Sequence, residues 1–348
     1  AWLNIIAKDI EKTPVNAIFE RTADGKKVAK FSIGTPGITL PKEKNAAALA
    51  AAILAGRPLS PAVVSSAPAA PDSSEAATLG IKELVGRGTT NFAGSPPNRV
   101  KNIKRGAELL NGTLIAPGEE FSLLAHLRPF TLENKYVPGL VIKAAEGKTA
   151  LEIGGGLCQI GTTMFRTVLN AGLPITARSN HSYRVGYYEP PVGMDATIYD
   201  PAPDFKFIND TGYWLLLTTR IEGVTATFEL WGTKDGRTVL LSEPEISNIR
   251  NPGPKKMIET TDLPVGVIKC TEKAHVGSDA RFTSTITYAD GRVAEKEFKS
   301  RYRPWQEVCL VGVETLSPPA EIPAAQPATQ TGTQTLPSAD ESGVTGND

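Results

Sequence analysis

The spacing of hydrophobic residues divides the chain into helical and strand-like segments. In some segments apolar residues recur every three or four positions, or alanines follow one another without a helix breaker, and both patterns predict helices. In other segments apolar residues alternate with polar ones, which predicts strands. Helices are predicted over 2–12, 42–54, 99–110 and 160–169. Strands are predicted on both sides of a turn within 15–33 and over 178–188, 196–199, 205–209, 214–220, 225–232, 265–271, 280–287 and 294–302. The expected fold class is multidomain α+β.

Capping and turn residues set the expected boundaries of these elements. Asn98 is the predicted N-cap of the helix over 99–110, and Asn111 with Gly112 is its predicted stop. Turns are expected at 277–279 and at Asp290-Gly291.

Four parts are predicted along the chain, because 348 residues are more than one ordinary domain with a single core contains. Residues 1–85 form an α+β unit without clustered titratable residues, and 86–236 place one long helix, which carries a cysteine, across a mostly antiparallel sheet. Residues 237–316 are almost entirely β-patterned. Residues 317–348 consist mainly of Pro, Ala, Thr, Gln and Ser, so a disordered tail is expected there.

Composition and charge narrow the class of function. Lys plus Arg and Asp plus Glu number 37 each, so the net charge is zero and a nucleic-acid partner is not expected. No apolar run approaches the roughly 18–20 residues that span a bilayer. The chain begins at Ala1 without a methionine, and we expect that a membrane anchor or signal has been removed.

The densest chemical signal is the run 154–159, Gly-Gly-Gly-Leu-Cys-Gln, which leads straight into the predicted helix at 160–169. Glycines free to adopt left-handed angles would then hold Cys158 at a helix N-terminus, where the helix dipole favours a thiolate. The backbone N–H groups of Gly155 and Gly156 could bind an oxyanion, and Gln159 could line the same pocket. The alternatives are a packed, inert cysteine and a solvent-exposed Gln159.

His181 is the strongest candidate base among the three histidines, because it lies in a polar segment 23 positions after Cys158. Asp195 could orient it and complete a triad, or could be a turn residue. His126, in an apolar loop, is a weaker candidate. A zinc site formed by Cys158, His181 and His126 lacks metal-site spacing, so neither a metal nor another cofactor is expected. Arg178 could bind a substrate carboxylate, or could form a surface salt bridge.

Three cysteines allow at most one internal disulfide. Cys270 and Cys309 are both flanked by apolar, β-prone sequence, and a bond between them would close a loop of roughly 40 residues, worth about 3–4 kcal/mol in the chain-entropy model. This pairing, which leaves Cys158 free, is predicted. The alternative is that all three are buried and reduced.

The middle of the chain resembles the VanW family of bacterial cell-envelope proteins. The matching motifs occur in the family's order at Asn98-Arg99, Asn102-Ile103, 114–122, 154–163, Arg178, His181-Ser182, Val185, Tyr187, Gly193, 195–197 and 204–209. The flanks resemble modules that accompany this family: 1–85 a peptidoglycan-binding domain, and about 250–313 a G-five module of Gram-positive surface proteins.

The resemblance implies an extracytoplasmic protein of a Gram-positive-type cell wall, anchored through a segment outside this chain. It implies a cysteine-dependent L,D-transpeptidase that forms 3-3 peptidoglycan cross-links, with stem peptides as partners. Cys158, His181 and Asp195 would be catalytic. Arg178, Gly155, Gly156, Gln159, Ser182 and Tyr187 would bind substrate. The alternatives are a non-catalytic peptidoglycan-binding protein and a cysteine amidase or peptidase acting on stem peptides.

Overall fold

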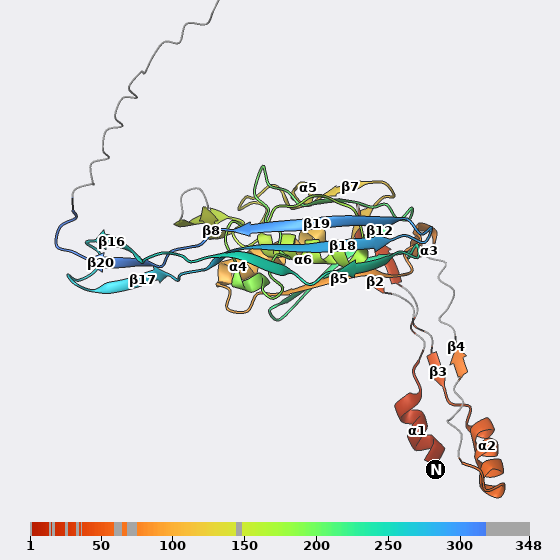
Figure 1. Cartoon of the computed structure of the whole chain (residues 1–348). Helices are drawn as coiled ribbons and strands as arrows, with labels where there is room; N and C mark the ends of the chain where they lie inside the picture. Colours follow the sequence, from red (N-terminus) through yellow and green to blue (C-terminus); the bar gives the residue numbers. More distant parts are fainter. Residues whose placement is uncertain are drawn as a thin grey trace, which may run out of the picture. The chain divides into compact units, whose positions relative to one another are not determined.

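The computed structural model describes residues 2–13, 15, 18–24, 27–32, 35, 37–58, 65–67, 75–143 and 148–317 (Figure 1). The chain divides into two compact units. The first comprises Ala1–Lys256 and Glu272–Val308, and the second comprises Met257–Thr271 with Cys309–Asp348. The predicted disordered tail lies outside the described residues from 318 onward. The predicted boundaries at 85, 236 and 316 stay predictions.

A four-stranded antiparallel sheet forms the centre of the first unit. Its strand order is β5-β13-β12-β6. The strands are β5 (Glu83–Asn91), β13 (Thr225–Gly232), β12 (Leu215–Glu222) and β6 (Thr113–Ile115). Gly86 and Gly88 of β5 let the backbone of helix α6 (Cys158–Ala171) lie close to the strand, because a Cβ on either glycine would come within 2.5 Å of Ala171 or Thr167.

Helices α4 (Pro97–Leu110) and α6 pack against this sheet and against each other. In α6, buried residues recur at helical spacing at Ile160, Met164 and Val168, and Gly172 ends the helix with a φ of 65°. The helix predicted over 160–169 is confirmed, and it begins at the cysteine itself. The N-cap prediction for Asn98 is wrong, because α4 already begins at Pro97 and the Asn98 amide donates to the Pro138 carbonyl at 2.9 Å.

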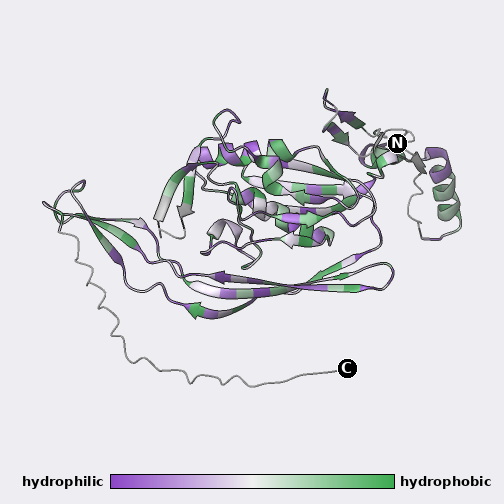
Figure 2. Ribbon diagram, turned by 90° about the horizontal axis from the view of Figure 1, so that it is seen from above, coloured by the Kyte–Doolittle hydropathy of each residue, from purple (hydrophilic) through white to green (hydrophobic). Residues whose placement is uncertain are grey.

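Four of the strands that follow residue 237 belong to the first unit, and the β18–β19 pair contributes to its core. Strands β14 (Thr238–Leu241), β18 (Gly277–Thr287) and β15 (Glu245–Arg250) form one sheet, and β19 (Val293–Tyr302) pairs with β18. Figure 2 shows hydrophobic and hydrophilic residues alternating along the β18–β19 hairpin. Its inward-facing Phe282 and Phe298 pack against Phe165 of α6, with ring centroids 6.3 and 5.4 Å away. The turn predicted at 277–279 is wrong, since these residues begin β18.

Shorter strands and an N-terminal segment complete the first unit. A three-stranded sheet has the order β10-β11-β7, with β10 (Ile175–Ala177), β11 (Lys206–Ile208) and β7 (Glu120–Ser122), and α5 (Leu123–Leu127) follows β7. The N-terminal elements are α1 (Trp2–Ile10), β1 (Ile18–Arg21), β2 (Val28–Ser32), β3 (Gly37–Thr39), α2 (Lys42–Leu54), β4 (Ser65–Ala67) and α3 (Glu75–Leu79). The predicted hairpin is confirmed as β1–β2, whose Phe31 packs on Trp231 of the central sheet. The strand predicted over 178–188 is wrong: only an isolated bridge at Ser179 and a 3₁₀ turn at Gly186–Tyr188 form there.

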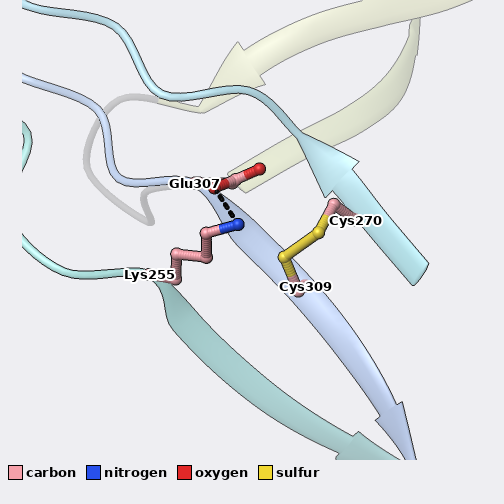
Figure 3. Close-up of a disulfide and its surroundings, with 4 residues drawn as sticks. All are labelled: Lys255, Cys270, Glu307 and Cys309. Carbon is pink, nitrogen blue, oxygen red and sulfur yellow. Dashed lines mark ion pairs between the residues drawn. A yellow bond between two sulfur atoms is a disulfide. The ribbon is translucent and has the colours of Figure 1, made fainter. Parts of the chain in front are cut away.

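The second unit is a small three-stranded sheet with a disulfide. Its strand order is β16-β20-β17, with β16 (Lys256–Thr260), β20 (Val308–Gly312) and β17 (Ile268–Glu272). A disulfide joins Cys270 of β17 to Cys309 of β20, the pairing that the sequence predicts (Figure 3). Cys158 is the free cysteine.

The α+β fold class is confirmed, because helices and antiparallel sheets share one core in the first unit. Among the helices of the described residues, none is both long enough and apolar enough to cross a membrane.

Candidate active site

Cys158 is the first residue of α6 and follows a turn built from glycine. Gly154 and Gly156 have φ angles of 86° and 105°, which side-chain-bearing residues rarely adopt. The backbone N–H groups at the start of a helix have no intrahelical partner, and within the described residues those of Gly156 and Cys158 form no hydrogen bond. The Cys158 thiol therefore lies beside two free backbone donors.

The turn is fixed against strand β8 (Pro138–Lys143) by close backbone contact. A Cβ on Gly155 would lie 2.4 Å from the Gly139 backbone, so only glycine fits there. Asn102 of α4 donates to the Gly155 carbonyl and to the Val137 carbonyl, at 2.9 Å each, and accepts from the Val137 N–H at 2.9 Å. Position 155 is thus required for packing. Its backbone N–H is a weaker oxyanion donor than the sequence suggests, because it already donates to the Glu152 carbonyl at 3.2 Å.

The imidazole of His181 interacts with both the Cys158 thiol and the Asp195 carboxylate. His181 Nδ1 lies 2.6 Å from Asp195 Oδ2. The same carboxylate oxygen accepts from the His181 backbone N–H at 2.8 Å. The thiol also lies 3.3 Å from the Thr197 hydroxyl. Sequence analysis left Asp195 open between an orienting residue and a turn residue, and it has the geometry of an orienting residue.

Burial and hydrogen bonding shift the pKa values of Cys158, His181 and Asp195. Burial raises the pKa of Cys158, but its hydrogen bond to His181 and the positive charge of that ring outweigh burial and lower the pKa to about 7. Burial lowers the pKa of His181, but its bonds to Asp195 and Cys158 raise it to about 10. Burial likewise raises the pKa of Asp195, yet the bond from His181 lowers it to about 2. At neutral pH the arrangement favours a thiolate, an imidazolium and a carboxylate.

Strand β19 supports the Asp195 carboxylate from behind. Tyr302 donates its hydroxyl to Asp195 Oδ1, and an Arg178 nitrogen lies 3.5 Å from the same oxygen. Because Tyr302 is 2% exposed and Asp195 4%, these contacts are shielded from water. A residue 107 positions along the chain thus completes the environment of the acid.

Arg178 is part of this support. Its side chain is 5% exposed and donates to the carbonyls of Asp195 and Gly193, at 2.8 Å each, and to the Ser300 hydroxyl at 2.9 Å. Its guanidinium also lies 5.1 Å from the centre of the Phe165 ring. Both readings from the sequence are wrong, since Arg178 neither lines the cleft nor forms a surface salt bridge. It joins β19 to the segment that carries Asp195.

Gln159 also differs from its predicted place. Its side chain is fully buried and donates to the Thr90 hydroxyl at 2.8 Å and to the Asn91 carbonyl at 3.3 Å. Its amide oxygen accepts from Arg99 at 2.7 Å. Gln159 therefore neither lines an oxyanion pocket nor faces water; it holds an arginine of α4.

A cleft of about 900 Å³ opens beside the thiol. Most of its lining is apolar, and His181, Gly156 and Tyr187 all face it. Strand β9 (Lys148–Ile153), paired with β8, contributes Leu151, which is 69% exposed. The polar and charged residues of the lining are Asn98, Arg99, Glu152, Cys158, His181, Tyr187, Tyr188, Thr197, Tyr199 and Asp200.

Of the remaining candidates, Tyr187 lies in this cleft and Ser182 does not. Ser182 accepts a hydrogen bond from the Arg303 backbone on its carbonyl, at 2.7 Å, and borders a separate cavity of about 400 Å³. Ser182 is therefore placed outside this cleft, and its contact with substrate stays a prediction. His126 bonds to the Ser122 carbonyl at 2.9 Å and stacks on Phe121, so it does not approach the thiol.

Sequence reasoning missed three residues that lie around Cys158, His181 and Asp195. They are Arg99, Thr197 and Tyr302. Arg99 and Thr197 fall within the motifs that carried the family resemblance, so the signal was there without a role attached. Tyr302 gave no such signal, because its contact depends on a strand far along the chain.

Known proteins match the central part of this chain. The family model described as "VanW like protein" matches residues 98–231. Among curated relatives, the Vancomycin B-type resistance protein VanW of Enterococcus faecalis is 34% identical over 147 residues, which cover 41% of this chain and 48% of that protein. The uncharacterized protein YoaR of Bacillus subtilis is 30% identical over 162 residues, 47% of this chain and 52% of that protein. The chain thus spans about half the length of these relatives.

Solved structures give two weaker likenesses. The G5 domain of an IgA1 protease is 14% identical with a TM-score of 0.16, over 24% of this chain and 100% of that structure. The G5 domain of HP0197 is 15% identical with a TM-score of 0.12, over 22% of this chain and 97% of that structure. Likenesses at such TM-scores carry no argument.

The predicted resemblance therefore rests on the sequence matches, whose span from α4 to β13 includes Cys158, His181 and Asp195. On these matches, the central part of this chain is similar to the VanW family.

Proposed function

We propose that this protein is a cysteine acyltransferase of the bacterial cell wall, an L,D-transpeptidase that forms 3-3 cross-links between peptidoglycan stem peptides. The observation that carries the proposal is the arrangement of Cys158, His181 and the buried Asp195, which places a thiol with a lowered pKa at the edge of a large cleft. Such a chain suits nucleophilic catalysis, because the thiolate attacks and the imidazolium supplies a proton.

In the first half of the reaction, the Cys158 thiolate attacks the carbonyl carbon of the amide between the third-position diamino acid and the following D-alanine. The backbone N–H groups of Gly156 and Cys158 stabilise the negative oxygen of the tetrahedral intermediate. His181 gives its proton to the amine of D-alanine as the C–N bond breaks, which leaves a thioester on Cys158 and a neutral imidazole.

In the second half, the amine of an acceptor stem peptide attacks the thioester carbonyl. His181 takes the proton from this amine, a new amide bond forms, and the Cys158 thiolate leaves. Asp195 keeps the imidazole in one orientation and stabilises its cationic form in both halves. No redox step or external cofactor is required, since His181 regains from the acceptor amine the proton that it gave to D-alanine.

The cell-wall setting is inferred from the family and from the disulfide. The VanW family is associated with cell-wall-related vancomycin resistance, and the relative from Enterococcus faecalis carries that resistance in its name. The Cys270–Cys309 disulfide favours a location outside the cytoplasmic membrane, because disulfides persist in oxidising compartments. We therefore propose peptidoglycan as the partner and the outer face of the membrane or the wall as the location.

The direct test incubates the purified protein with disaccharide-tetrapeptide muropeptides and follows products by mass spectrometry. We expect a cross-linked dimer together with released D-alanine, and a thioester adduct on the peptide that contains Cys158. Cys158→Ala should remove all three while leaving the unfolding transition in place. Release of D-alanine without a dimer, even with added acceptor amine, would instead indicate a hydrolase. Unchanged cross-linking by Cys158→Ala would contradict a cysteine mechanism altogether.

The pH dependence of thiol alkylation tests the ion pair without a substrate. Because His181 lowers the pKa of Cys158 to about 7, the rate with iodoacetamide should reach half its plateau near that pH. His181→Ala removes the hydrogen bond and the positive charge and leaves burial, which raises the pKa. The half-point should therefore move above the roughly 8.5 of a free thiol. A wild-type half-point equal to that of denatured protein would contradict an activated thiol.

A further inference from the structure

Arg99 of α4 is the arginine that lines the cleft beside Cys158. The cleft also contains the carboxyl groups of Glu152 and Asp200, and Asp200 lies 2.5 Å from a nitrogen of Arg128. Within the described residues, by contrast, the guanidinium of Arg99 makes no ion pair: its hydrogen-bond partners are neutral. A half-buried cation without a counter-charge in a mostly apolar cleft favours an anionic ligand.

The guanidinium of Arg99 is held in place before any ligand arrives. It donates to the Gln159 amide oxygen at 2.7 Å, to the Ser95 hydroxyl, and to the Tyr188 hydroxyl at 3.4 Å. Its central carbon lies over the Tyr187 ring, 4.0 Å from the centroid. These contacts use at most three of the five N–H donors of an arginine, so at least two stay available for a carboxylate. A side chain fixed in this way loses little further entropy on binding.

Arg99 also lies next to the turn that carries the thiol. A Cβ built on Gly156 would come within 2.5 Å of Arg99 Cγ, so the absence of a side chain at Gly156 makes room for the arginine stem. Gln159, which holds the guanidinium, directly follows Cys158 in the chain. A ligand group bound by Arg99 is therefore positioned relative to the start of α6, where the thiol is.

We propose that Arg99 is the carboxylate-binding residue of the cleft and selects substrates that carry a free carboxylate next to the amide attacked by Cys158. This inference rests on the proposed function, in which the residue after that amide is a D-alanine. It gives to Arg99 the role that the sequence had suggested for Arg178. Gln159, Tyr187 and Tyr188 act through Arg99 and are positioning residues.

The test uses the thiol itself as a reporter and needs no turnover. Cys158 is alkylated with N-ethylmaleimide, which is neutral, and with 3-maleimidopropionate, which is of similar size and carries a carboxylate. If Arg99 binds carboxylates, the wild-type protein should react faster with the anionic reagent than free cysteine would predict. In Arg99→Gln the ratio of the two rates should fall roughly tenfold or more, as expected for the loss of a charge-assisted hydrogen bond.

Arg105→Gln is the matched control, because Arg105 lies on the same helix but donates to Asn134 outside the cleft. Its rate ratio should equal that of the wild type. Arg99→Lys keeps the charge, and its ratio should lie between those of wild type and Arg99→Gln. An unchanged ratio in Arg99→Gln would overturn the proposal, as would an equal fall in Arg105→Gln.

Turnover of muropeptide donors then tests whether carboxylate binding by Arg99 contributes to the proposed reaction. A donor whose terminal carboxylate is amidated should lose at least tenfold in kcat/KM with wild-type protein and far less with Arg99→Gln. If neither protein turns over any donor while the maleimide ratio still depends on Arg99, the transpeptidase assignment fails and the carboxylate site stands. If both donors are turned over equally well by the wild type, the carboxylate site fails and the enzyme assignment stands.

Discussion

Phe165 of α6 is fully buried and packs on aromatic rings from three other segments, whereas four of the five residues of β17 are exposed. The first unit has a continuous apolar core, and beside it the Asp195 carboxylate and the Tyr302 hydroxyl, which support His181, lie shielded from water. The second unit is a three-stranded sheet with a disulfide across two of its strands.

This difference separates two ways of stabilising a β-rich region. Where packing excludes water, charged groups can be held in one geometry, and their mutual hydrogen bonds become strong enough to shift pKa values. Where little apolar surface is buried, packing contributes little and a covalent cross-link takes its place. We therefore expect activated chemistry only in the first unit.

The largest effect on stability should come from truncating the shared core. Phe165→Ala should lower the free energy of unfolding by about 3–5 kcal/mol, because it removes buried aromatic contacts and leaves a cavity. Ile268→Ala in the second unit should change it by less than about 0.5 kcal/mol, since Ile268 is 59% exposed. Urea denaturation of both variants measures the contrast. Similar losses would contradict the view that only the first unit depends on packing.

Removing the disulfide should act on the second unit alone. The bond spans 39 positions, and a loop of this length is worth about 4 kcal/mol in the chain-entropy model. In the double variant Cys270→Ser, Cys309→Ser, amides of β17 and β20 should exchange with deuterium much faster. The alkylation rate of Cys158 should stay at the wild-type value. Loss of Cys158 reactivity would show that the two regions are coupled.

A smaller effect on stability should follow from removing the Tyr302 hydroxyl, which donates to the buried Asp195 carboxylate. Tyr302→Phe keeps the ring but takes a donor from Asp195, which should cost about 1–2 kcal/mol in thermal or urea unfolding. Tyr183→Phe is the control, because within the described residues the Tyr183 hydroxyl has no hydrogen-bond partner while its ring packs on Trp305. A loss as large in Tyr183→Phe would mean that the Tyr302 hydroxyl has no special role.

The smallest effect should come from an exposed ion pair. Arg281 lies 2.6 Å from Glu245, and both side chains are more than half exposed. Arg281→Ala should therefore cost less than about 1 kcal/mol, and the cost should shrink as salt is added. A loss comparable to that of Tyr302→Phe, persisting in high salt, would contradict the distinction between buried and exposed polar contacts.

The local elements around the thiol could be predicted from the sequence. The glycines before Cys158 predict a turn with left-handed angles, and the spacing of Ile160, Met164 and Val168 predicts the helix that follows. The disulfide partners followed from counting three cysteines and from the β-rich sequence around two of them. Each of these depends on residues close in the chain, or on the chemistry of one residue type.

The tertiary structure decided which side chains meet in the cleft. Arg178 and Arg99 belong to motifs of the same family resemblance, yet Arg178 is buried against β19 and Arg99 faces the cleft, because the folded path of distant strands determines what lies behind each residue. Tyr302 reaches Asp195 only because the β18–β19 hairpin packs on α6. Hydrophobic periodicity predicts which face of a strand is buried, but not which polar group lies opposite it, since that depends on contacts between segments about a hundred residues apart.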